Sequence, residues 1–372
     1  MAGLAAHREL NRSVRFAVAG DADEADIRRL LRESPMRGAV SVTFEREPDY
    51  FRGADLAGGK DQTIVAYENG HLVCMGRCTQ RECWVDGRAT PVGYLAELRL
   101  DSEARRRFAI VREGYRFFRE LQSDTLHFTS IASDNDRARR LLENGARGMP
   151  TYGFLGELVT LLIAVPRRPR LPKLRVEPAT TAHIPALLRV LNQHGRRYQF
   201  ATVWTAERLH SLARHGLPLE RFLIAMDGGE IIACGALWDQ RCFRQTVIQG
   251  YAGALGLGRP WLNVANRILG RPHLPPPGTA LAQAFLSPLA LRDGAEALLP
   301  ELVEAFFPLA SKLGIEWLTL ALPAGDARLS VLRRKFFTRA WPSRLYRVSW
   351  SEQSAFEFVS PEKRFLPEVA LL

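Results

Sequence analysis

The chain has 372 residues, 47% of them hydrophobic and 24% charged, which excludes low-complexity and collagen-like proteins and allows a sizeable buried core. At roughly 100–200 residues per domain, this length predicts two domains or one large one. The net charge of +11 rests on arginine, because only five residues are lysine. Such an arginine bias often reflects genome composition, so we expect an anionic ligand or partner but no nucleic-acid partner.

The five cysteines include no C-x-x-C pair, so we expect buried, reduced thiols and no metal site. Reduced thiols are typical of a reducing compartment. No apolar run approaches the roughly 20 residues that span a bilayer, and the N-terminal residues lack the apolar core of a secretion signal. We therefore expect a cytoplasmic protein without a membrane partner; the oligomeric state is not indicated.

The first predicted elements are a strand over 14–19 and a helix with an Ile-x-x-Leu-Leu face at 27–31. Two apolar runs within 63–81 then flank Asn69-Gly70, a pair that favours a tight β-hairpin turn. These residues predict a strand, a helix and a hairpin in that order.

An alternating strand over 94–101 comes next, followed by a helix over about 105–122 with apolar residues at helical spacing. A further strand covers 126–132. Asn135 then marks the N-terminal cap of another helix, and Gly145 is placed to end it.

The second half of the chain repeats the first. Residues 222–240 align with 63–81 without a gap, and the matched pairs are Ala66 with Ala225, Gly70 with Gly229, and Gly76 with Gly235. A strand over 174–179 and a second Ile-x-x-Leu-Leu face at 184–188 precede this hairpin, as in the first half. Two copies of one α/β unit explain the repeat.

Residues 281–287 align with 95–101 without a gap, which sets Gln283 opposite Glu97. A Pro/Arg stretch between the copies cannot continue a helix and indicates a linker. The predicted organisation is an N-terminal extension (1–13), a first domain (14–165), the linker (166–173), a second domain (174–350) with an insertion at 251–279, and a C-terminal tail (351–372).

Two segments resemble motifs of the GCN5-related N-acetyltransferase (GNAT) superfamily. LRLDSEARRRFAI, 98–110, is similar to its pyrophosphate segment R/Q-x-x-G-x-G/A, and SDNDRARRLLENG, 133–145, to its later motif N-x-x-A-x-x-x-Y-x-x-x-G. The resemblance implies an α/β (α+β) fold of two tandem GNAT-like domains, each a mixed central sheet flanked by helices. The sequence departs from the family at Phe108, Ile110 and Leu142, which replace two glycine positions and a tyrosine.

The resemblance implies acetyl-CoA as co-substrate, bound by the first domain. Main-chain N–H groups near the central strand would polarise the thioester carbonyl, and the following helix N-terminus would hold the pyrophosphate. The cofactor contacts that it implies are Leu98, Arg99, Leu100, Arg105, Arg106, Arg107, Phe108, Ala109, Ile110 and Asn135. The alternative for the three consecutive arginines is that Asp101 and Glu103 offset them in solvent.

Glu97 occupies the position where family members often carry a general base, so the resemblance implies that it deprotonates the acceptor amine. The alternative is a structural ion pair with Arg99, which shares its face of the strand. Tyr94 and Tyr152 are candidate acids for the leaving thiolate. The acceptor pocket is expected between the first helix and the hairpin, at Phe44, Glu45, Tyr50 and Phe51, unless these residues only pack the domain edge.

The resemblance thus implies an acyl-CoA-dependent N-acyltransferase that transfers acetyl to a primary amine of a small molecule or peptide by direct attack in a ternary complex. Two alternatives stay open. One is an aminoacyl-tRNA-dependent transferase of the tandem-GNAT type, and the other is a non-catalytic acyl-CoA-binding or regulatory module. The replaced glycines and tyrosine favour the second alternative.

Overall fold

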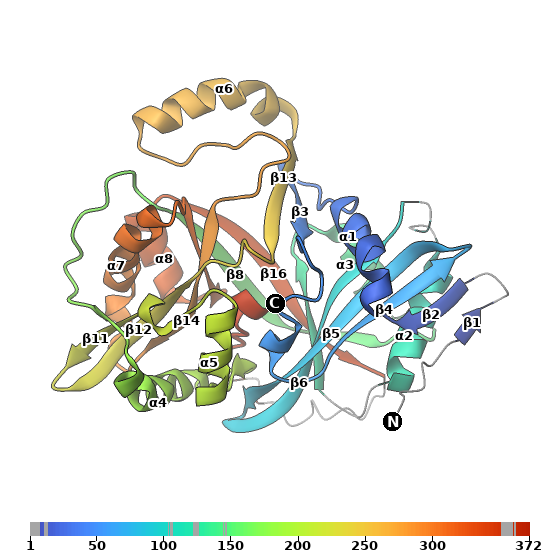
Figure 1. Cartoon of the computed structure of the whole chain (residues 1–372), viewed down its shortest axis with the longest axis horizontal. Coiled ribbons are helices and arrows are strands. Elements are labelled where there is room, and N and C mark those ends of the chain that lie inside the picture. The colour runs from blue at the N-terminus through green and yellow to red at the C-terminus, as the bar shows by residue number, and fades with distance from the viewer. Residues whose placement is uncertain are drawn as a thin grey trace.

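A computed structural model describes residues 8–10, 14–102, 104, 107–121, 126–143, 145, 147–350, 360 and 362–372. One mixed sheet runs through the whole molecule, with helices against both of its faces (Figure 1). Its strands lie in the order β1-β2-β4-β5-β6-β7-β16-β8-β15-β14-β12-β11-β9. The α/β fold of two GNAT-like units is confirmed.

The first unit supplies one side of this sheet. Its elements are β1 (Arg8–Leu10), β2 (Val14–Val18), α1 (Glu24–Arg32), β3 (Val40–Glu45), β4 (Asp61–Glu68), β5 (His71–Val85), β6 (Arg88–Leu100), α2 (Phe108–Leu121), β7 (Leu126–Ala132), α3 (Asp136–Glu143) and β8 (Thr151–Ala164). The apolar residues of α1 and α2 pack into two separate clusters on β4 and β5.

The second unit supplies the other side. Its elements are β9 (Glu177–Pro178), α4 (Ile184–Gly195), β10 (Ala201–Thr202), α5 (Ala206–Arg214), β11 (Phe222–Asp227), β12 (Glu230–Trp238), β13 (Gln245–Tyr251), α6 (Gly253–Ile268), β14 (Gln283–Leu291), α7 (Leu299–Lys312), β15 (Trp317–Pro323), α8 (Ala327–Lys335) and β16 (Thr338–Ser349). Helices α7 and α8 pack into one apolar cluster of this unit, and α4 and α5 into another.

The predicted hairpins form in both units with the same register. Gly70 and Gly229 have φ values of 81° and 83°, the left-handed conformation that glycine adopts without strain. Each hairpin also carries a β-bulge at the matched position, next to Ala66 in one copy and Ala225 in the other. The glycine in each turn therefore favours the same hairpin in both copies.

The proposed match of Gln283 with Glu97 is wrong. Leu95, Leu98 and Leu100 of β6 pack in or against the apolar cluster of α2. Leu286, Leu289 and Leu291 of β14 pack in the same way in the cluster of α7. The equal spacing of the two sets places Pro288, and not Gln283, opposite Glu97, so the strand was placed five residues too early. Both segments are short apolar runs, which a sequence pattern can match in more than one register.

The two units exchange their last strands. Strand β16 of the second unit pairs with β7, and β8 of the first unit pairs with β15 and β16. Strands β3 and β13 form a second, two-stranded sheet that also joins the units. The large sheet is therefore continuous from the first unit to the second.

The end of the chain is part of the core and not an appendage. Phe365 is buried and packs against Phe200, with ring centroids 5.0 Å apart. Ala370, which is 2% exposed, lies in the apolar cluster of the second unit. The chain terminus consequently reaches the middle of the molecule, between the two units (Figure 1). Among the described helices, none is both long and apolar enough to cross a bilayer.

Candidate functional site

The two central strands of the first unit separate part-way along their length. Strands β6 and β7 pair in parallel from Val92 to Leu95 and no further along β6. Beyond that point β6 bulges, because Ala96 pairs with Arg77 and Arg99 with Met75. Glu97 and Leu98 are thus left without ladder partners on β5, at the point where the strands open.

Glu97 has a left-handed backbone, with φ of 54°. A side chain with a Cβ adopts this conformation at a cost of about 1–2 kcal/mol, so the surroundings must hold it. Arg46 does so through two contacts with Oε1, from Nε at 2.7 Å and from Nη2 at 2.6 Å. The hydroxyl of Tyr50 donates to Oε2 at 3.0 Å. Both carboxylate oxygens are therefore engaged.

The charges around Glu97 determine the pKa of its carboxyl group. Burial raises the pKa of the carboxyl, but the charges of Arg46, Arg77 and Arg244 outweigh it and hold the pKa at about 2. Arg77 Nη1 lies 3.8 Å from Oε1. Glu97 therefore pairs with Arg46 and Arg77, and the ion pair with Arg99 that we considered does not form. Arg99 instead donates to the carbonyl of Leu98 at 3.1 Å.

These arginines were not anticipated from the sequence. Arg77 is 8% exposed and donates from Nε to Oδ1 of Asp61 at 2.8 Å. Arg244 comes from the second unit, just before β13; burial and the charge of Arg46 lower its pKa to about 10. A charged residue inside the apolar strand 72–78 was the one available signal for Arg77, because an unpaired charge is rarely buried.

The last residues of the chain contact two arginines, Arg81 and Arg244. Arg81 donates to the backbone oxygen of Leu371 at 2.8 Å, and Arg244 contacts that of Leu372. Gln240 donates to the carbonyl of Ala370 at 2.9 Å. Arg244 thus lies between the carboxylate of Glu97 and the end of the chain.

The four predicted acceptor-pocket residues do not form one group. Tyr50 is 1% exposed and shares its hydroxyl between Glu97 and Thr63. Phe51 packs on Tyr50 and on the cluster under α1. Phe44 and Glu45 lie on β3 and face the second unit: Phe44 contacts Trp341, and Glu45 accepts a hydrogen bond from Gln249 at 3.4 Å.

The residues that the resemblance assigns to the cofactor surround the start of α2. Arg107 pairs with Glu68, Phe108 is half-buried, Ala109 is exposed, and Ile110 is in the core. Leu98 and Leu100 are partly buried next to the α2 cluster. Arg105 and Arg106 lie outside the described residues.

Asn135 forms the predicted helix cap. Its Oδ1 accepts a hydrogen bond from the Ala138 N–H at 3.1 Å, and its carbonyl accepts from the Arg139 N–H. This satisfies donors that a helix N-terminus otherwise leaves free. The geometry explains Asn135 without a cofactor.

Of the two candidate acids, Tyr94 is buried and Tyr152 is partly buried. Tyr94 shares a hydrogen bond of 2.7 Å with Ser130 of β7, across the point where the strands separate. Tyr152 pairs with Tyr115 of α2. Burial raises the pKa of both Tyr94 and Tyr152, so each holds its proton at neutral pH.

The second unit has the same opening, but the chain itself fills it. Strands β14 and β15 stop pairing after Phe285, and β14 bulges at Ser287-Pro288. Residues 366–369 of the tail lie in the gap, where Ser287 Oγ donates to Glu368 at 2.6 Å. The remaining cavity is about 60 Å³, whereas ligand pockets measure roughly 300–1,000 Å³.

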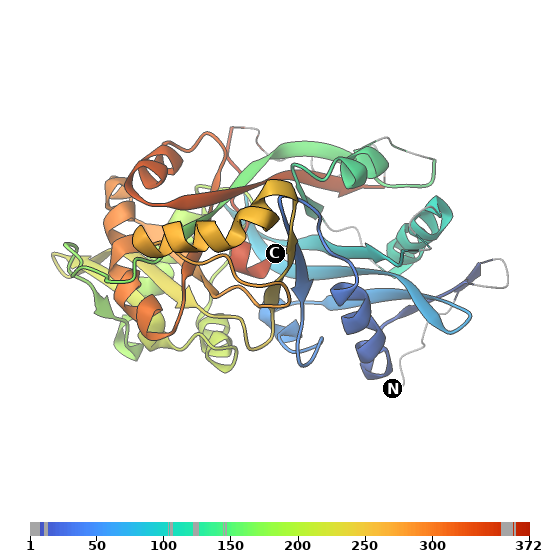
Figure 2. The ribbon, with the colours of Figure 1, turned by 90° about the horizontal axis from the view of Figure 1, so that it is seen from above.

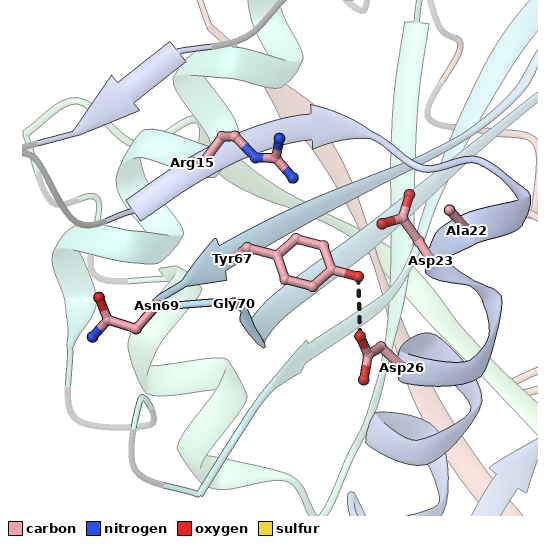
Figure 3. A pocket seen from close by; sticks show the side chains of 7 residues that line it. All are labelled: Arg15, Ala22, Asp23, Asp26, Tyr67, Asn69 and Gly70. Atoms are coloured by element: carbon pink, nitrogen blue, oxygen red, sulfur yellow. Dashed lines mark hydrogen bonds between the residues drawn. The ribbon is translucent and has the colours of Figure 1, made fainter.

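A hollow of about 500 Å³ lies elsewhere, beside the turn of the β4–β5 hairpin (Figure 3). It is lined in part by Arg15, Asp23, Asp26 and Tyr67, whose hydroxyl donates to Asp26 at 3.4 Å. This end of the hairpin is far along β5 from the bulge partner Arg77 of the strand opening. Among the described residues, no three His, Cys, Asp or Glu side chains are grouped as metal ligands are.

No family model and no curated protein matches the sequence. Solved structures match the fold. N-myristoyltransferase of Saccharomyces cerevisiae with bound myristoyl-CoA aligns with a TM-score of 0.62 and 11% identity, over 92% of this chain and 84% of that one. A GCN5-related N-acetyltransferase from Sphaerobacter thermophilus aligns with a TM-score of 0.54 and 12% identity, over 91% and 96%. The chain shares the fold of these two proteins.

Proposed function

We propose that the protein is an acyl-CoA-dependent N-acyltransferase, with acetyl-CoA as co-substrate and a primary amine of a small molecule or peptide as acceptor. The observation that carries the proposal is the opening between β6 and β7, where the bulge leaves Glu97 and Leu98 unpaired in the ladder. Backbone N–H groups released in this way can stabilise the oxyanion that forms on a thioester carbonyl. The fold shared with acyltransferases supports the same chemistry.

The cofactor occupies the first unit in this proposal. The equivalent opening of the second unit contains residues 366–369, which leave too little room for a pantetheine arm. The second unit instead completes the acceptor side by contributing Arg244 and the β13 strand. One molecule of acyl-CoA per chain is the expected stoichiometry.

In this proposal Glu97 holds the side chains of Arg46 and Arg77 in place and does not accept the proton of the amine. An α-amino group has a pKa of about 8, so a carboxyl with a pKa near 2 is a weaker base by roughly 6 pKa units. The amine therefore enters as its neutral form and attacks the carbonyl carbon. The C–N bond forms, the C–S bond breaks, and the amine proton leaves to water while CoA departs as its thiolate.

Release of CoA thiol is the direct test. The protein is incubated with acetyl-CoA or myristoyl-CoA and a panel of amines and N-terminal peptides, and the thiol is followed with a chromogenic disulfide. We expect turnover that rises with pH as the acceptor amine loses its proton. Ser287→Ala, at the bulge of the second unit, should leave turnover unchanged.

A non-catalytic acyl-CoA-binding module is the second candidate. Two observations favour it. Both carboxylate oxygens of Glu97 already accept hydrogen bonds, and Arg107 is already paired with Glu68, so groups that catalysis would use are engaged within the protein. This candidate predicts saturable acetyl-CoA binding with no thiol release for any acceptor. Turnover above the rate without protein excludes it.

A further inference from the structure

The insertion in the second unit carries a helix whose apolar side chains face solvent. Helix α6 stands apart from the body and is connected to it through β13 and a return loop (Figures 1 and 2). Its side chains Leu257, Trp261, Val264 and Ile268 are 87%, 79%, 56% and 80% exposed. At 100° per residue they fall within about 60° of one another, so they form one stripe, here called the α6 stripe.

The opposite face of α6 is hydrogen-bonded to the return loop of the insertion. Asn263 donates to the carbonyl of Leu274 at 3.1 Å and accepts from its N–H at 2.7 Å. Arg259 donates to the same carbonyl at 3.3 Å. Helices of soluble proteins normally turn their apolar stripe inward. Here hydrogen bonds fix the polar face inward and leave the apolar face in water.

The surroundings of the α6 stripe are cationic. Residues 251–282 contain three arginines and no aspartate or glutamate. The linker adds a second basic segment, with Arg168, Arg170 and Lys173 exposed and Leu171 92% exposed. Arg167 of the linker bonds His273 of the insertion at 2.7 Å, which joins the two segments into one surface.

We propose that this surface docks on an anionic phospholipid bilayer, with the α6 stripe in the acyl-chain boundary and the arginines on lipid phosphates. An exposed apolar stripe with tryptophan, flanked by basic residues, is typical of helices that lie in the membrane interface. Sixteen helical residues extend only about 24 Å, so α6 lies on the bilayer and does not cross it. The proposal replaces our expectation of no membrane partner.

Charge decides between a bilayer and a second copy of the chain. A symmetric dimer through α6 would place the same basic surface on both sides of the interface, and like charges would repel. Anionic headgroups instead complement the arginines and the lysine of the linker. The inference does not depend on the proposed catalytic function.

Vesicle sedimentation tests the proposal with the full-length protein. We expect it to pellet with vesicles of phosphatidylglycerol and phosphatidylcholine, and at least tenfold less with phosphatidylcholine alone or at high salt. The double variant Leu257→Glu with Ile268→Glu should lower the partition more than tenfold. Arg168→Gln with Arg170→Gln should lower it several-fold on anionic vesicles only.

Matched controls separate docking from misfolding. Met226→Glu changes an exposed apolar residue on the edge-side strand β11 and should leave partition unchanged. Brominated lipids should quench wild-type tryptophan fluorescence, and Trp261→Phe, which keeps the stripe apolar, should bind normally but lose most of that quenching. Wild-type protein that stays in solution with anionic vesicles, or an α6-dependent dimer in light scattering without vesicle binding, overturns the proposal.

Discussion

Replacing Glu97 with glutamine removes the negative charge that Arg46 and Arg77 face in a nearly buried environment. The Glu97 side chain is 13% exposed and that of Arg46 is 10% exposed. Losing one partner of a buried ion pair costs about 3–5 kcal/mol, because the remaining charge stays desolvated. The pKa gives a similar figure: a fall from 4.5 to about 2 corresponds to about 3 kcal/mol of stability.

The stability that Glu97 contributes decreases as the pH falls. Because folding lowers the pKa of Glu97, its contribution to stability is present above pH 4.5 and is lost as pH falls toward 2. At pH 7, Glu97→Gln should therefore lower the thermal midpoint by about 4 °C, taking about 1.3 °C for each kcal/mol from roughly 2.1 cal/mol/K of unfolding entropy per residue. The gap between variant and wild type should narrow between pH 5 and pH 3.

Circular dichroism melts of four variants complete the test: Glu97→Gln, Arg46→Met, these two combined, and Glu45→Gln. Glu45→Gln is the matched control, since Glu45 is also largely buried but accepts hydrogen bonds from Thr43 and Gln249, which are neutral. It should cost about 1 kcal/mol. Arg46→Met combined with Glu97→Gln should cost less than the sum of the two single changes. A Glu97→Gln midpoint within 2 °C of wild type, or a gap that widens in acid, would refute the reasoning.

Three further outcomes follow from single contacts. Asn135→Ala should destabilise α3 by about 1 kcal/mol in a thermal melt and leave acetyl-CoA affinity unchanged; weaker binding would make Asn135 a cofactor contact. Burial raises the pKa of Glu368, so its charge costs stability as pH rises above the usual glutamate range; Glu368→Gln should gain thermal midpoint over wild type from pH 5 to pH 8, and an unchanged gap would count against this. A thiol reagent should label only Cys242 in the native protein, because the other four cysteines are buried, and labelling that survives Cys242→Ser would contradict this.

The sequence predicted what depends on neighbouring residues. The Asn69-Gly70 turn, the amphipathic face of α1 and the Asn135 cap each follow from local chemistry, and their order led to the fold. Buried thiols were predicted for all five cysteines. Four are buried, but Cys242 is exposed, so that part of the prediction is wrong.

What the sequence could not show depends on contacts between distant segments. Arg46 and Arg244 are 198 residues apart and meet at Glu97 only because β3 and β13 pair. The strand exchange between β8 and β16 requires long-range register that no local pattern specifies. The tail was predicted to be an appendage, yet residues 366–369 line the second opening.

Calorimetric titration with acetyl-CoA tests the central claim most directly, since the claim places one cofactor in the opening of the first unit. Arg105→Ala with Arg106→Ala removes two of the arginines that lie between β6 and α2 in the sequence, and Arg292→Ala removes the arginine that directly follows β14. We predict one site per chain in the wild type, weaker binding in the first variant and unchanged binding in the second. Two equal sites, no binding, or a loss of affinity confined to Arg292→Ala would contradict the account.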